Sequence, residues 1–430
     1  MDAKSFILVT GANGFLGTWI VRQLLENGNR VRAAVRSLNR RTYLRELFSS
    51  YSGSLEIVAV GDMTESNAFD QAVVGVDGII HTASPVTTIA DDPQELIRPA
   101  VKGVTGILES ARDHETRIRR IVITSSCAAI LDTSEVKMVV SEQDWNDQRV
   151  QECETLGRSA SGLSKYSASK TLTERAAWEF VEANKERISW DLATINPPYI
   201  FGPTIPDVKG PDSLKSSSAL FYNAVVNNNN FFGTDPLTSP SHAWVDVHDV
   251  AAAHVKALET PGVARERIIV SAGSWVWQDM INTALSLPKS IYRPHRDVTG
   301  PREVTMRLIT FETGKQKRIL GLSLRSLEEC VRDILLDYAK RGWYPGVDWL
   351  DGRGLGASMC DWVQVELSRM GSSRGVMLIN HEDDPSTLNP TTEPWIWTSQ
   401  ASGQWHAPGT SSPTPGVLSC GDKHPHPHLQ

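Results

Sequence analysis

Short apolar runs alternate with longer amphipathic stretches over the first 120 residues. Each apolar run is followed by polar or glycine-containing positions that favour a turn. This rhythm is typical of β-α-β units built around a parallel sheet, whose strands are buried on both faces and therefore continuously apolar. The pattern predicts five strands in this part of the chain: Phe6–Thr10, Val31–Val35, Leu55–Val60, Gly78–His81 and Ile121–Ser125.

Helices are expected where apolar residues recur three and four positions apart. Between the first two strands, residues 16–26 place Ile20 and Leu24, and Val21 and Leu25, at i and i+4, which predicts a helix packed on the sheet. The composition also favours helices at 164–183 and 250–259, and strands at 192–195 and 268–271. The fold class expected is α/β, a Rossmann-like doubly wound parallel sheet with a smaller C-terminal substrate lobe and a poorly ordered C-terminal tail.

Changes in composition suggest where the chain divides. A nucleotide-binding domain is expected over 1–195, with 240–272 returning to it, and a mainly substrate-binding lobe over 196–345. Residues 197–240 are rich in Pro, Gly, Ser and Asn and show no regular period, which suits either a substrate-facing lid or an ordinary surface excursion. Residues 346–430 are expected to form a low-order extension, and its closing His-Pro repeat is interpreted as a solvated tail rather than a metal site.

Composition and charge narrow the function classes. The chain has 430 residues, of which 40% are hydrophobic and 22% are charged, which is enough apolar material for a globular core. Its net charge of −7 argues against nucleic acid as a partner. Five scattered cysteines, no apolar run long enough to span a membrane and no secretory leader indicate a reduced, cytoplasmic protein, expected to be a monomer or a homodimer.

A glycine-rich turn follows the first predicted strand. The segment Thr10–Gly17 reads TGANGFLG and stands between strand and helix, where glycines let a pyrophosphate approach the backbone N–H groups of a helix start. The spacing is G-x-x-G-x-x-G rather than G-x-G-x-x-G, so the strand-turn-helix context carries the prediction, against the alternative of a plain tight turn.

The end of the second strand indicates which dinucleotide is expected. An NAD-selective fold places an acidic residue there to hold the ribose 2'-hydroxyl, whereas this chain has Arg36, followed by Arg40 and Arg41. A guanidinium can bind a 2'-phosphate through charge-assisted hydrogen bonds. NADP(H) is therefore the predicted cofactor, the alternative being that these arginines are a solvated edge.

A second constellation predicts carbonyl chemistry. Tyr166 and Lys170 form a Y-x-x-x-K pair on one helix face, and a strand ending in Ser125 and Ser126 precedes them. A tyrosine hydroxyl can donate a proton to a carbonyl oxygen while a serine hydroxyl polarises it. Lys170 and the positive nicotinamide are expected to share a lowering of the Tyr166 pKa from about 10 towards neutrality, a shift of about 3 units. The alternative is an amphipathic face with a buried ring and a snorkelling amine.

Taken together, these residues resemble the extended short-chain dehydrogenase/reductase family, in the branch of dihydroflavonol reductases and fungal aldehyde and ketone reductases. Further segments of the chain are similar to motifs of that branch: VDGIIHTASP at Val76–Pro85, EQDWN at Glu142–Asn146, NPPYIFGP at Asn196–Pro203, WVDVHDV at Trp244–Val250 and RSLEE at Arg325–Glu329. The resemblance covers about residues 5–344 and implies a Rossmann-like lobe, a C-terminal substrate lobe and bound NADP(H).

The resemblance also implies site residues. Ser126, Tyr166 and Lys170 match the catalytic serine, tyrosine and lysine. The positions that match the cofactor site, Tyr166 and Lys170 included, are Gly11, Asn13, Gly14, Phe15, Leu16, Gly17, Arg36, Arg40, Asp62, Met63, Thr82, Ala83, Ser84, Pro197 and Ile200. No metal is implied. Phe221, Tyr222 and Trp244 are hypothetical substrate contacts, with core packing the favoured alternative for each.

The function expected is NADPH-dependent reduction of an aldehyde or ketone to an alcohol, in a setting such as secondary metabolism. Tyr166 would donate the proton, and Lys170 would tune the pKa of Tyr166. Ser126 would polarise the carbonyl group of a small-molecule substrate. Because the fold alone does not fix the reaction, an epimerase, a dehydratase or a hydroxysteroid dehydrogenase stays open as an alternative. A non-catalytic NADP-sensing module is the third possibility.

Overall fold

The computed structural model describes most of the chain up to Trp343. The described residues are 4–343, without 38, 40, 86, 115–116, 132–133, 135, 228–241, 290 and 293–307. The extension expected at 346–430 lies outside them, as does its His-Pro repeat. Among the described residues, no helix combines the length and apolar character that crossing a membrane requires.

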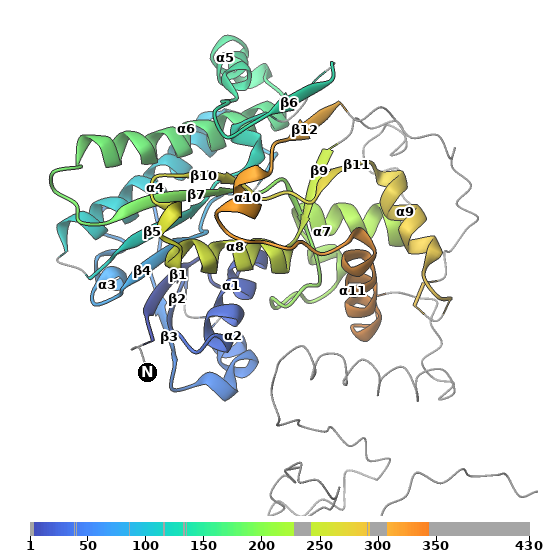
Figure 1. The fold of residues 1–430 in the computed structure, drawn as a ribbon, viewed down its shortest axis with the longest axis horizontal. Coiled ribbons are helices and arrows are strands. Elements are labelled where there is room, and N and C mark those ends of the chain that lie inside the picture. Colours follow the sequence, from blue (N-terminus) through green and yellow to red (C-terminus); the bar gives the residue numbers. More distant parts are fainter. Residues whose placement is uncertain are drawn as a thin grey trace, which may run out of the picture. The chain divides into compact units, whose positions relative to one another are not determined.

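A seven-stranded parallel sheet forms the centre of the molecule, in the order β10-β7-β5-β4-β1-β2-β3 (Figure 1). This order places the start of the chain in the middle of the sheet and reverses direction between β1 and β4, as in doubly wound folds. The strands are β1 (Phe6–Thr10), β2 (Arg30–Val35), β3 (Leu55–Ala59), β4 (Gly78–His81), β5 (Arg120–Thr124), β7 (Asp191–Asn196) and β10 (Arg267–Ile269).

Helices cover both faces of this sheet, and alternate strand residues face each layer. Ile7 and Val9 of β1 join the core beneath α1 and α8, whereas Phe6 and Leu8 join the core beneath α4 and α6. Double coverage explains why each strand is a continuous apolar run. The helices are α1 (Phe15–Glu26), α2 (Arg41–Leu47), α3 (Asp70–Val73), α4 (Gln94–Asp113), α5 (Asp147–Leu156), α6 (Gly162–Ala183) and α8 (Val247–Glu259).

The later part of the chain builds a second core beside the sheet, rich in aromatic side chains. It is formed by residues between Phe201 and Trp343, among them Phe221, Trp275 and Tyr338. The elements of this region and two short accessory sheets are β6 (Met138–Val140), β8 (Tyr199–Phe201), β9 (His242–Asp246), β11 (Gly273–Trp275), β12 (Ile309–Phe311), α7 (Ser216–Phe221), α9 (Trp277–Ser286), α10 (Gly314–Arg318) and α11 (Leu327–Lys340). The two-lobe division at residue 196 stays a prediction.

The sequence predicts the sheet well and the connecting region poorly. All seven strands and the three helices expected from periodicity are confirmed, with bounds that differ by three residues or fewer. The stretch 197–240, which shows no period in the sequence, contains β8, a 3-10 turn at Pro211–Ser213, α7 and a π-helical turn at Tyr222–Val226. These elements are too short for a period to show. Residues 228–240 lie outside the described part.

The packing of α1 predicts a large effect of one substitution. Ile20 is fully buried between α1 and the sheet. We expect Ile20→Ala to lower the free energy of unfolding by about 2–5 kcal/mol, because the lost methyl and methylene groups leave a cavity that the surrounding side chains refill only partly. Urea unfolding of the purified protein measures the change. Glu26→Ala on the exposed end of the same helix is the control, expected within about 1 kcal/mol; equal effects of the two substitutions would contradict this account.

Candidate active site

The glycine-rich turn joins β1 to α1 at the carboxyl edge of the sheet. Gly11 adopts a φ of +64°, in the left-handed region that glycine favours, and its carbonyl accepts a hydrogen bond from the Gly14 amide at 2.8 Å. A Cβ on Gly17 would lie 2.2 Å from the Gly11 carbonyl oxygen. The turn is therefore so tight that these positions admit no side chain.

The same turn exposes the start of a helix to a ligand. Gly14 occupies the N-cap of α1 and has no side chain to compete for the N–H groups of the first turn. Asn13, Gly14 and Phe15 line a cavity of about 540 Å³ that extends to the segment after β8. A helix N-terminus facing a cavity of this size fits the pyrophosphate of a dinucleotide.

Two predicted cofactor residues, Arg36 after β2 and Asp62 after β3, lie next to each other. The Arg36 guanidinium lies 3.4 Å from the Asp62 carboxylate, and the Arg36 side chain is 83% exposed. Hydrogen bonds from the backbone and hydroxyl of Thr64 lower the pKa of Asp62 against a small opposing effect of burial, and Arg36 lowers it further. An exposed guanidinium at this place remains accessible to a 2'-phosphate. Arg40 lies outside the described residues.

The segment after β4 packs directly on the glycine turn. The Thr10 hydroxyl accepts hydrogen bonds from the amides of Thr82 and Ala83, both at 3.2 Å, and the Thr82 hydroxyl donates to the Thr10 carbonyl. His81 contacts the same threonine hydroxyl at 2.9 Å. Burial, aided by the charge of Lys170, lowers the pKa of His81 to about 3, so the imidazole is neutral.

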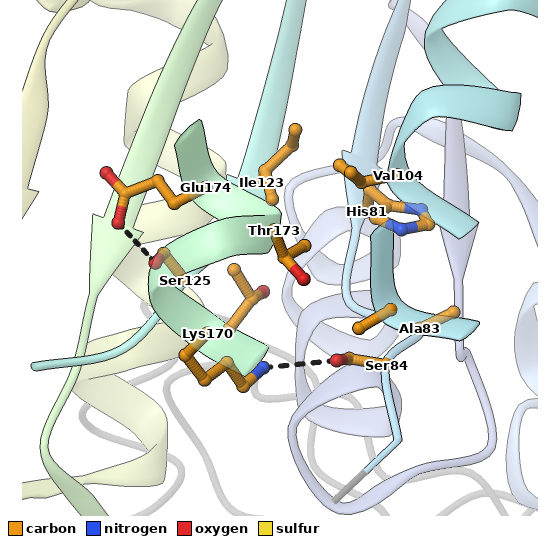
Figure 2. A pocket seen from close by; sticks show the side chains of 11 residues that line it. His81, Ala83, Ser84, Val104, Ile123, Ser125, Lys170, Thr173 and Glu174 are labelled. Atoms are coloured by element: carbon orange, nitrogen blue, oxygen red, sulfur yellow. Dashed lines mark hydrogen bonds between the residues drawn. The ribbon is translucent and has the colours of Figure 1, made fainter. Parts of the chain in front are cut away.

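Ser126, Tyr166 and Lys170 converge at the end of β5. Ser126 caps the 3-10 turn Cys127–Ala129, and its hydroxyl accepts a hydrogen bond from the Ala128 amide at 3.0 Å. Tyr166 and Lys170 lie one turn apart on α6, with the Lys170 Nζ 5.9 Å from the centroid of the tyrosine ring. The Lys170 ammonium donates to the Ser84 hydroxyl at 3.2 Å, as Figure 2 shows.

Burial sets the protonation of the tyrosine and the lysine. It raises the pKa of Tyr166 to about 12, partly opposed by a hydrogen bond with the Ser126 side chain. It lowers the pKa of Lys170 to about 8, against the opposing effect of the Glu174 carboxylate. In this structure loss of hydration outweighs the Ser126 hydrogen bond. The expected shift of the Tyr166 pKa towards neutrality, which also depends on the nicotinamide, stays a prediction.

The remaining predicted residues occupy separate places. Pro197 accepts a hydrogen bond from the Cys127 amide at 2.9 Å, which joins the segment after β7 to the Ser126 turn. Leu16 and Ile200 pack in the core beneath α1 and α8, whereas Met63 packs on the opposite face of the sheet. Phe221, Tyr222 and Trp244 are buried in the aromatic core, in agreement with the core-packing alternative for each.

A buried ion pair behind these residues escapes the sequence analysis. The Glu174 carboxylate lies 2.6 Å from the Arg267 Nε, and their side chains are 0% and 10% exposed. Glu174 follows Lys170 by four residues, so the Y-x-x-x-K spacing extended by one turn could have indicated it. Arg267 is 93 residues away in the sequence, and nothing in its local pattern indicates its partner. Lys209 and Lys215, which line the cavity at the glycine turn, are likewise missed.

Known proteins are similar to this chain in sequence and in fold. The sequence model of the NAD dependent epimerase/dehydratase family matches residues 7–273. The chain belongs to this family. It is 38% identical to an uncharacterized oxidoreductase of Schizosaccharomyces pombe, over 78% of this chain and 96% of the relative. It is 30% identical to the NADPH-dependent methylglyoxal reductase of Saccharomyces cerevisiae, over 76% of this chain and 96% of that enzyme.

Solved structures of the epimerase/dehydratase family resemble the chain over the same extent. The crystal structure of yeast methylglyoxal/isovaleraldehyde reductase complexed with NADPH is similar with a TM-score of 0.68 at 28% identity. The likeness covers 79% of this chain and 99% of the yeast protein. The doubly wound fold and the recognition of an extended short-chain reductase are thereby confirmed, while the roles of individual site residues stay predictions.

The tight approach at Gly17 predicts that an added methyl group disrupts the dinucleotide site. Because the Cβ in Gly17→Ala would collide with the backbone of Gly11, the turn must shift away from the start of α1. We expect NADPH, followed by its fluorescence on binding, to bind roughly tenfold or more weakly, equivalent to about 1.4 kcal/mol or more. Gly53→Ala, where a Cβ meets nothing within 4 Å, is the matched control. Equal affinity in both variants would show that the turn does not carry the cofactor.

Proposed function

We propose that the chain catalyses NADPH-dependent reduction of an aldehyde or ketone to an alcohol. The observation that carries the proposal is the convergence of Ser126, Tyr166 and Lys170 beside the glycine turn. Relatives named as NADPH-dependent reductases support it, since they share the fold over nearly their whole length. The chain is thus an NADP-dependent oxidoreductase, and its substrates are small carbonyl compounds.

The cofactor is NADP(H), and the residues that would hold it lie along the carboxyl edge of the sheet. The start of α1 faces the pyrophosphate, Arg36 the 2'-phosphate, and Lys170 the ribose. Bound NADPH supplies the hydride that reaches the carbonyl carbon. Asp62, already paired with Arg36, orients this guanidinium.

Tyr166 acts as the proton donor in this proposal. Its raised pKa of about 12 means that the resting hydroxyl carries the proton that the carbonyl oxygen receives. When the carbon–oxygen double bond becomes a single bond, this proton completes the alcohol and leaves a phenolate on Tyr166. Ser126, hydrogen-bonded to Tyr166, donates to the same carbonyl oxygen and polarises it. Lys170, one helical turn away, stabilises the phenolate once it forms. It therefore favours loss of the Tyr166 proton during the reaction rather than in the resting enzyme.

Removal of the Tyr166 hydroxyl tests the proton donor. We expect Tyr166→Phe to lower kcat by roughly 10²- to 10⁴-fold, because a general acid contributes a factor of this size. The assay follows NADPH oxidation with a panel of aldehydes, α-dicarbonyls and aryl ketones. Tyr51→Phe, outside the site, is the control and should retain full activity. If the wild-type protein binds NADPH but consumes none with any carbonyl, the reductase proposal fails and an epimerase or a sensing module is favoured.

Reversal of the charge at Arg36 tests the choice of cofactor. In Arg36→Asp a carboxylate replaces the guanidinium next to Asp62, so a 2'-phosphate would face two negative charges. We expect KM for NADPH to rise roughly tenfold or more while KM for NADH changes by less than about threefold. Steady-state kinetics with both cofactors measures the ratio. An equal effect on the two cofactors would remove Arg36 from the 2'-phosphate site.

A further inference from the structure

The Glu174 side chain is buried directly behind the site, on the same helix as Tyr166 and Lys170. The residue is 1% exposed, and its carboxylate accepts a hydrogen bond from the Ser125 hydroxyl at 2.5 Å (Figure 2). The Asn196 amide donates to the same oxygen at 2.8 Å. Further donors complete its surroundings: Thr194 Oγ1 at 3.2 Å, Trp178 Nε1 at 3.3 Å and Arg267 Nε at 2.6 Å.

These contacts join α6 to the ends of the strands that border the site. Ser125 immediately precedes Ser126 at the end of β5, and Asn196 is the last residue of β7. The Asn196 side-chain amide also lies 3.3 Å from the Ser126 carbonyl oxygen. Glu174 therefore holds Ser126 in two ways, through the preceding residue Ser125 and through Asn196. A shift of the carboxylate would therefore move Ser126 relative to Tyr166, whose helix carries Glu174.

Arg267 fixes the orientation of the carboxylate from the opposite side. Its Nη2 also donates to Glu174, at 3.4 Å, and its Nη1 donates to the carbonyls of Glu142 and Asp144 at 2.6 and 2.8 Å. The guanidinium carbon also lies 3.7 Å from the centroid of the Trp145 ring. With the arginine anchored at three points, the carboxylate that pairs with it has one preferred orientation.

We propose that Glu174 is a positioning residue for the proposed reduction, whose carboxylate holds the Ser126 strand end in place against the helix that carries Tyr166 and Lys170. This proposal rests on the proposed function and adds a residue to it. The charge of Glu174 has a second effect, because it opposes the lowering of the Lys170 pKa by burial.

Other titratable groups near the two side chains do not replace this charge. Facing Lys170 are His81 on β4, neutral with a pKa of about 3, and Tyr166, protonated with a pKa of about 12. Facing Glu174 are Arg267 on β10 and the Cys127 thiol, whose pKa burial raises well above its usual value. Among these described groups Glu174 is the anion that stabilises the Lys170 ammonium.

Substitution by the isosteric amide tests the role. Glu174→Gln keeps the size of the side chain but removes its charge. An NH2 group also replaces one of the two carboxylate oxygens, so the donors to that oxygen lose their acceptor. We expect kcat to fall roughly 10- to 100-fold, whereas KM for NADPH changes by less than about threefold. The alkaline limb of the kcat profile should move to lower pH by about one unit, because burial then lowers the Lys170 pKa further and its ammonium is lost earlier.

Glu142 offers a matched control beside the same arginine. It is also buried, and its carboxylate accepts a hydrogen bond from the Ile269 amide at 3.3 Å. Glu142→Gln should leave kcat and the alkaline limb unchanged. Equal losses in Glu142→Gln and Glu174→Gln would overturn the proposal, since loss of any buried carboxylate in this region would then account for them.

Stability is separated from positioning by a second variant. Glu174→Gln leaves the Arg267 guanidinium buried without its counter-ion, which destabilises the fold. The double variant Glu174→Gln with Arg267→Met removes that unpaired charge and should recover much of the lost Tm while kcat and the alkaline limb stay altered. Recovery of kcat together with Tm would overturn the proposal. If neither variant folds, Ser125→Ala decides: roughly fivefold lower kcat supports the link to Ser126, and unchanged kcat refutes it.

The wild-type assay distinguishes failure of this proposal from failure of the proposed function. Wild-type turnover with unaltered kinetics in Glu174→Gln overturns the positioning role alone. If the wild type reduces no carbonyl, the proposed function fails. The pKa of Lys170 can then be measured without an activity assay, by NMR titration of its ¹³Cε resonance, which is assigned by its loss in Lys170→Ala. A midpoint about one unit lower in Glu174→Gln then supports the inference, and an unchanged midpoint overturns it.

Discussion

The register of the parallel sheet determines which side chains meet at the site. Thr10 of β1 is aligned with His81 of β4, His81 with Ile123 of β5, and Thr124 of β5 with Ile195 of β7. The residues that follow these positions therefore leave the sheet at one level, and they are the glycine turn, the Thr82–Ser84 segment, the Ser126 turn and the segment after Asn196. A slip of one residue in any pair would turn these side chains to the opposite face of the sheet.

Burial of this edge explains the charge state of the site. The same loss of hydration moves His81, Lys170 and Tyr166 towards their neutral forms, with pKa values of about 3, 8 and 12. At neutral pH the site therefore holds a neutral imidazole, a protonated phenol and one ammonium. The ammonium tolerates burial because a hydroxyl accepts from it at 3.2 Å and a carboxylate lies one helical turn away.

The sequence predicts those features that local patterns encode. The bounds of β1 and β4 are predicted without error, because apolar runs end there at a glycine turn or a polar segment. Tyr166 and Lys170 follow from spacing, and strand position indicates the neighbouring serines, whereas the choice of Ser126 follows from the family resemblance. The Glu174–Arg267 pair joins residues 93 apart, a distance over which no periodicity carries information. For Phe221 and Tyr222 the sequence favours burial in a core, as is usual for large aromatic residues, but which residues form that core depends on tertiary packing.

The segment after β8 links the cavity at the glycine turn to the aromatic core. The Tyr43 hydroxyl of α2 donates to the Ile205 carbonyl, and the Arg341 guanidinium of the chain after α11 donates to the Thr204 carbonyl. The Asp337 carboxylate accepts from the Thr204 amide at 2.9 Å. Since Tyr43 and Thr204 both line the cavity, its wall is fixed to elements of both cores. A change in the packing of α11 is therefore expected to reach the proposed dinucleotide site through the Thr204 backbone, without contact with the proposed catalytic side chains.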